Sequence, residues 1–139
     1  MTQAFSLFHG EFANARALAL AARAVKEEPT STAQQIAQVF KHVYGRPPTE
    51  AEAKRSLAHV GEMLAHHKAN PPKEVPLPTE VTVSNIIEKT GEPELITFQL
   101  DILKNYERDL QPWQVDAETR ALAELCLVLL NSSEFLHVY

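Results

Sequence analysis

The chain has 139 residues, of which 45% are hydrophobic and 22% are charged, and this balance excludes a disordered or low-complexity protein. Thirteen Lys and Arg against eighteen Asp and Glu give a net charge of -5, which is the wrong sign for a general nucleic-acid binder. The longest apolar runs have six residues, against about 20 in a membrane-spanning helix, so no transmembrane segment is expected.

The first expected element is a helix from Phe5 to about Lys26. Apolar or small side chains recur at helical spacing along its expected buried face, at Phe5, Phe8, Phe12, Ala15, Ala19 and Ala22. A second helix starts after Pro29, where Ser31 and Gln34 have the spacing of a capping box. Gly45 is suited to end this helix, because glycine adopts the left-handed conformation at low cost.

A third helix is expected to open with a capping box formed by Thr49 and Glu52. Its apolar stripe comprises Ala53, Leu57, Val60 and Leu64. Residues 69–80 then hold four of the nine prolines and show no helical period, which predicts an extended internal proline-rich loop.

The segment after this loop is harder to assign. Ser84 can cap a brief helix from Asn85 to Lys89, which Gly91 would close. In residues 94–104 the apolar positions fit both the alternation of a strand and the period of a helix. We expect a helix there, with the strand as the open alternative.

The last long helix is expected over residues 116–131, with Asp116 as its N-cap. Leu122, Leu125, Cys126 and Leu129 form its inner stripe, and further apolar residues make this helix apolar nearly all round. We therefore predict that residues 1–139 form an all-α fold, a single-domain bundle of five or six helices with this helix at its centre.

The candidate metal ligands are His59, Glu62 and His66, whose spacing places two imidazoles and a carboxylate on one side of the third helix. Counted around the helix from Ala53, however, these residues lie opposite the expected buried stripe. We therefore expect a solvated polar surface. A metal-dependent hydrolytic or redox enzyme part that uses these three ligands is the alternative.

The sequence gives little support for other kinds of catalytic or binding site. It indicates no catalytic residue and no cofactor. The four scattered glycines form no phosphate-binding loop, and Ser132 and Ser133 lack a nucleophile elbow. Cys126 lies on an apolar helix face, where a thiol acts as a small hydrophobic side chain. The acidic residues between Glu88 and Asp109 indicate a solvated or partner-binding surface rather than a catalytic pair.

Several segments occur in the order of a known family. These segments are Gln3-Ala4-Phe5 to Phe12 with Ala15-Arg16-Ala17-Leu18-Ala19, Tyr44-Gly45-Arg46-Pro47-Pro48-Thr49-Glu50-Ala51-Glu52, and Arg120 to Cys126 with Leu129-Leu130-Asn131-Ser132-Ser133-Glu134-Phe135-Leu136. Thr90-Gly91-Glu92-Pro93 and Asp109-Leu110-Gln111-Pro112-Trp113 are similar to its middle section. Together they resemble the planctomycete-specific domain of unknown function, which lies at the C-terminal end of large bacterial proteins, often downstream of a cytochrome c domain.

This resemblance implies that the chain is the C-terminal part of a longer, exported protein of the periplasm or cell envelope. The family offers no catalytic residues to carry over. The chain departs from the full-length pattern, because it has neither a signal peptide nor a Cys-x-x-Cys-His haem-attachment motif. We therefore expect a non-catalytic structural or interaction domain whose partners are upstream domains of the parent protein or another protein. The oligomeric state is left open.

Overall fold

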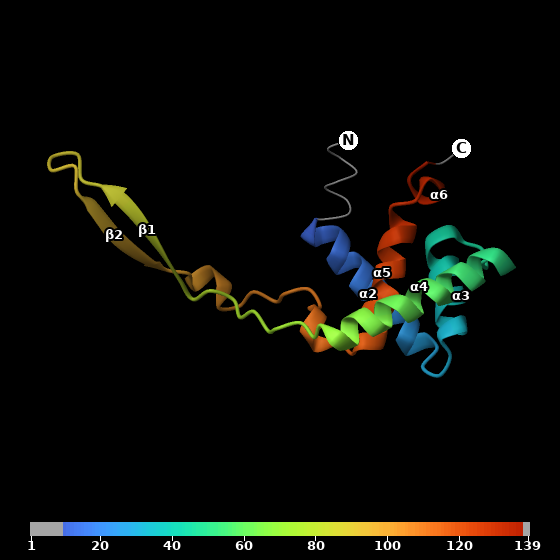
Figure 1. Ribbon diagram of the computed structural model, residues 1–139. Coiled ribbons are helices and arrows are strands. Elements are labelled where there is room, and N and C mark those ends of the chain that lie inside the picture. Colours follow the sequence, from blue (N-terminus) through green and yellow to red (C-terminus); the bar gives the residue numbers. More distant parts are fainter. Residues whose placement is uncertain (1–9, 138–139) are drawn as a thin grey trace. The chain divides into compact units, whose positions relative to one another are not determined.

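The structure is a computed structural model that describes residues 10–137 (Figure 1). In chain order its elements are α2 (Glu11–Glu27), α3 (Thr32–Tyr44), α4 (Glu50–Ala69), β1 (Glu80–Ile86), β2 (Pro93–Gln99), the 3-10 helices η1 (Asp101–Leu103) and η2 (Pro112–Gln114), α5 (Ala117–Leu130) and α6 (Ser133–Leu136). They form two compact units. We call the described residues up to Lys73 and from Asp109 onward the helical unit, and Glu74–Arg108 the hairpin unit.

The prediction of an all-α fold is wrong, because β1 and β2 pair as a two-stranded antiparallel sheet and make the fold a mixture of α and β. The helix expected in residues 94–104 is a strand up to Gln99, followed by η1. The brief helix expected from Asn85 to Lys89 is also wrong, since this segment holds the end of β1 and part of the turn.

Local sequence explains why a hairpin forms where helices were expected. Val81 and Val83 are β-branched and alternate with polar residues, and Ile96 and Thr97 are also β-branched, which favours strands. Gly91 has a φ of 69°, which a turn can use and which other residues rarely adopt. Pro93 is the first residue of β2, one of the few strand positions that tolerate proline.

The helical unit is built around α5, as predicted. Its buried residues are Thr119, Ala121, Leu122, Leu125, Cys126, Leu127 and Leu129. The helices α2 and α4 make the most extensive contacts with α5, and α3 packs against all three. Lys68 forms an ion pair with Glu118 at 3.3 Å, and His67 Nε2 lies 3.1 Å from a carboxylate oxygen of Glu124, so the end of α4 lies beside the first half of α5.

The predicted buried face of the first helix is wrong. Phe12 is 75% exposed and Ala19 is also exposed. The buried side chains of α2 are Ala17, Leu18, Ala21 and Ala24. Alanine is abundant on both sides of this helix, so periodicity did not distinguish the two faces, and the small side chains suit close packing of helices. Phe5, Phe8 and the expected helix start lie outside the described residues.

The predicted helix ends are more accurate. Gly45 follows α3 with a φ of 71°, and Thr49 and Glu52 form the complete capping box of α4. Asp116 caps α5 by accepting a hydrogen bond from the Thr119 amide at 2.8 Å. Ser31 caps α3, since its hydroxyl oxygen accepts a hydrogen bond from the Gln34 amide at 3.4 Å, although the Gln34 side chain does not complete the expected capping box.

The central position of α5 gives a stability prediction. Leu125 is 4% exposed, so Leu125→Ala should lower the free energy of unfolding by about 2–5 kcal/mol by leaving a cavity. Val128 lies on the same helix but is 46% exposed, and Val128→Ala should cost about 1 kcal/mol or less. Urea unfolding followed by circular dichroism measures both values, and equal losses would contradict this assignment of the core.

Candidate functional site

The three candidate metal ligands lie on α4 in different surroundings. Glu62 and His66 are exposed, as expected, whereas His59 is half-buried. The His59 Nε2 atom is buried and has no hydrogen-bond partner among the described residues. The expectation of a solvated face is thus wrong for His59, because α4 buries Ser56 while Leu57 is exposed.

Metal coordination gains no support from the wider arrangement of side chains. Within residues 10–137, no group of three or more His, Cys, Asp or Glu side chains is placed to hold a metal ion. Two other histidines bind carboxylates: His42 Nε2 lies 2.7 Å from Glu27 and links α2 to α3, and His67 links α4 to α5. The hydrogen bond with His42 lowers the pKa of Glu27.

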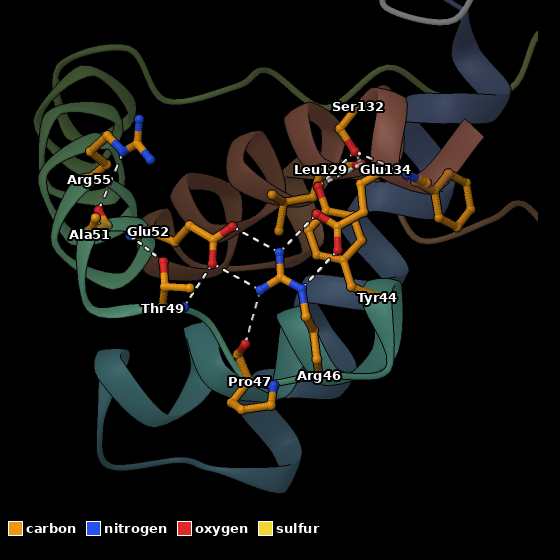
Figure 2. A network of polar contacts seen from close by, with 11 residues as sticks. Tyr44, Arg46, Pro47, Thr49, Ala51, Glu52, Arg55, Leu129, Ser132 and Glu134 are labelled. Carbon is orange, nitrogen blue, oxygen red and sulfur yellow. Dashed lines mark hydrogen bonds and ion pairs between the residues drawn. The ribbon is translucent and has the colours of Figure 1, made fainter. Parts of the chain in front are cut away.

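The most highly connected polar group is Arg46, which lies between α3 and α4 (Figure 2). Its Nη1 and Nη2 atoms donate to the two carboxylate oxygens of Glu52 at 2.9 Å, and its Nε and Nη2 atoms donate to Glu134 at 2.8 Å. Nη1 also donates to the carbonyl of Pro47 at 3.1 Å. A guanidinium has five N–H donors, so these bonds use all of them.

Aromatic and hydroxyl groups complete this contact, which we call the Arg46 cluster. The guanidinium carbon lies 5.3 Å from the ring centre of Tyr44 and 5.9 Å from that of Phe40, within cation–π distance. Ser132 Oγ donates to the Leu129 carbonyl at 2.7 Å, so the Tyr44 hydroxyl donates to Ser132 Oγ at 2.7 Å. The cluster therefore attaches α6 and the end of α5 to the α3–α4 junction.

The electrostatics of the cluster follow from these bonds. Hydrogen bonds from Arg46 and from the Thr49 backbone lower the pKa of Glu52 from its usual 4.5 to about 2. The carboxylates of Glu52 and Glu134 raise the pKa of Arg46 in turn. The cluster is a structural contact, because the guanidinium has no donor left for a ligand and Glu52 is committed to Arg46 and Thr49.

Sequence reasoning found part of this cluster. It identified the Thr49–Glu52 capping box, which the structure confirms. The pairing of Arg46 with Glu134 was missed, since the two residues are 88 positions apart and no local period relates them. Both residues lie in segments that carry the family resemblance, so the structure brings two of those segments into contact.

A shallow, open pocket of about 280 Å³ lies beside the cluster. It is lined by Phe40, Tyr44, Glu52, Arg55, Ser56, His59, Leu125, Val128 and Leu129. Sites for small molecules commonly enclose about 300–1,000 Å³ and bury most of the ligand. The pocket is at the lower limit of that range and is open to solvent, so it does not form a built binding site.

The candidate nucleophiles serve the fold. Cys126 is fully buried on α5, and burial raises the pKa of its thiol, which keeps the sulfur protonated and unreactive. Ser132 caps α6 by accepting a hydrogen bond from the Phe135 amide at 3.3 Å, besides its bond to Leu129. Neither residue is placed for catalysis by these contacts.

The hairpin unit presents a different kind of candidate site. Its exposed large apolar residues are Val75, Val81, Val83, Ile86, Ile87, Leu95, Phe98, Ile102 and Tyr106. The acidic residues expected to form a contact surface are also here, since Glu88, Glu92 and Glu94 lie in or beside the turn of the hairpin. The proline-rich residues 71–78 that precede β1 contain neither helix nor strand.

Comparison with known proteins finds no matching family model, no similar curated protein and no similar solved structure. The resemblance to the planctomycete-specific domain therefore stays a prediction. No helix within residues 10–137 combines the length and the apolar character that crossing a membrane requires.

The Arg46 cluster predicts a pH dependence of stability. Glu52 is more acidic when folded than when unfolded, so its contribution is complete above pH 4.5 and is lost as the pH falls towards about 2. Glu52→Gln should lower the free energy of unfolding at pH 7 and flatten its decline between about pH 5 and 2. Glu50→Gln, at an exposed acid in the same helical turn, should keep the wild-type slope. Urea unfolding at several pH values measures these slopes, and equal slopes for both variants would contradict the prediction.

Metal content provides a second test. We expect the purified protein to contain no stoichiometric zinc, iron or copper by elemental mass spectrometry, because His59 and His66 differ in burial and residues 10–137 assemble no group of metal ligands. His59→Ala should leave the metal content unchanged. About one equivalent of metal that His59→Ala abolishes would instead support the metal-dependent alternative.

Proposed function

We propose that the chain is a non-catalytic interaction domain, in which the helical unit is a stable platform and the hairpin unit provides the contact surface. One observation carries this proposal. Every buried hydrophobic residue of the described chain belongs to the helical unit, whereas large apolar side chains of the hairpin unit are exposed. Exposed apolar patches mark interaction surfaces in many proteins.

The polar groups of the helical unit support the same proposal. Arg46, His42 and His67 are engaged in contacts between helices, and Cys126 is buried. These groups stabilise the platform, and we therefore assign binding to the hairpin unit.

The family resemblance supplies the proposed context. In this context, the domain is one part of a larger exported bacterial multidomain protein of the periplasm or cell envelope. Its partner is an upstream domain of that protein or another protein. The proline-rich residues 71–78, which precede β1, and the acidic side chains of residues 88–109, which include β2, extend the proposed contact surface.

Replacement of Glu74–Arg108 by a Gly/Ser linker of equal length tests this division of roles. The core lies outside these residues, so the variant should melt within a few degrees of the wild type. It should also lose the cross-links that the wild-type protein forms to other domains or proteins in the producing cells.

Two results would contradict the proposal. Unfolding of the linker variant would mean that the hairpin unit is required for the core. Retention of every wild-type cross-link would place the contact surface elsewhere.

A further inference from the structure

The two faces of the β1–β2 hairpin differ in character. Directly opposed residues share a face, so Val81 pairs with Phe98 and Val83 pairs with Ile96 on one face. We call these four residues the apolar face. On the other face Thr82 bonds to Thr97 at 2.8 Å between their hydroxyls, and Gln99 donates to Glu80 at 3.0 Å.

The apolar face is accessible to a partner. Val81 and Val83 are each 42% exposed and Phe98 is 52% exposed. A two-stranded sheet on its own is only marginally stable in water, and it gains stability when a face is covered. Covering this face would therefore stabilise the hairpin as well as create an interface.

The size of this face limits what it can bind unaided. Seven residues at about 3.3 Å each, on two strands about 4.8 Å apart, give one whole side of the sheet an area on the order of 200 Å², and the four residues of the apolar face cover only part of it. A stable interface buries about 1,000 Å² or more in total, so apolar contact on this face alone gives a weak complex. The charged residues beside the face are a second source of attraction.

The charge near the face is acidic. Residues 80–99 contain four Glu and one Lys, a net charge of -3. Glu94 lies on the same side of the sheet as the apolar face, opposite Asn85, and Glu88 and Glu92 are in the adjoining turn. Complementary charges increase the association rate and select among partners.

Building on the proposed function, we propose that the apolar face binds an apolar protein surface that is flanked by Lys and Arg. Docking of this hairpin on the hairpin of a second copy would bring two net charges of -3 together, and an anionic membrane would also repel the hairpin. A protein surface that combines apolar residues with Lys and Arg complements both the apolar face and the glutamates beside it.

The test places the photoreactive residue p-benzoylphenylalanine at Val83 in the whole protein, irradiates the producing cells and identifies the attached peptide by mass spectrometry. Thr82 is the matched control position, because it is the exposed neighbour on the opposite face. We expect an adduct at position 83 on another protein segment, one with apolar residues beside Lys or Arg. The yield at position 83 should exceed that at position 82 by at least about fivefold.

Two substitutions make the test specific to one face. With the probe at position 83, Phe98→Thr should lower the yield at least about fivefold, because it removes a large apolar contact. Leu95→Thr should change the yield less than about twofold, because Leu95 is on the opposite face although it is 72% exposed. Threonine favours strands, so both variants should keep the hairpin, which carbon chemical shifts of β1 and β2 verify.

The identified peptide, once synthesised, provides the charge test. Glu92→Gln combined with Glu94→Gln should weaken its binding to the purified protein, and added salt should reduce the difference between this variant and the wild type. Unchanged affinity of the double variant for the peptide would overturn the proposal that the partner surface is basic.

Several adducts would overturn the proposal: a lipid, a second copy of this chain, its own helical unit, or a segment without Lys or Arg. Equal yields at positions 82 and 83, or no adduct at position 83, would overturn the assignment of the face. If any of these results occurs but linker replacement of the hairpin unit still removes the cellular cross-links, the proposed interaction domain is retained and only the role of the apolar face is rejected. If it removes none, the proposed function fails as well.

Discussion

The helical unit depends on the burial of one helix, α5, which is apolar around most of its circumference. A helix of this kind is stable in water only when neighbours cover several of its sides. The chain meets this demand with α2 and α4, which make the largest contacts, and with α3, which also reaches α5. The small alanines of α2 allow close packing along one side, and the longer side chains of α3, such as Phe40, fill the space between helices.

The Arg46 cluster complements this apolar packing at the end of α5. Hydrophobic burial brings helices together without direction, whereas a guanidinium with two bidentate carboxylates fixes their orientation. Arg46 binds Glu52 at the start of α4 and Glu134 in α6, so the chain leaving α5 is held against the α3–α4 junction. The hairpin unit has no equivalent of either device and relies on the hydrogen bonds between β1 and β2.

Sequence reasoning succeeded where a signal is local and chemically specific. Gly45, Thr49 and Asp116 mark helix ends because each satisfies backbone groups within a few residues. It failed where two patterns coexist, as in residues 94–104, and where alanine occupies both sides of a helix, as in α2. The solvated position expected for His59 was wrong because Leu57 was taken as buried, and the side that α4 buries is set by the position of α5. The link from Arg46 to Glu134 exists only in the folded chain.

The hairpin unit is inserted in sequence between the two parts of the helical unit, and this order affects folding. The 35 residues from Glu74 to Arg108 separate α4 from α5, so the helix at the centre of the core is synthesised after α2, α3 and α4. The first three described helices have exposed apolar faces until α5 arrives. Closing a longer insertion costs only about 0.6 kcal/mol per doubling of its length. The insertion can therefore change in length or sequence with little effect on the stability of the helices, so its sequence is constrained less by the core than the sequences of the helices are.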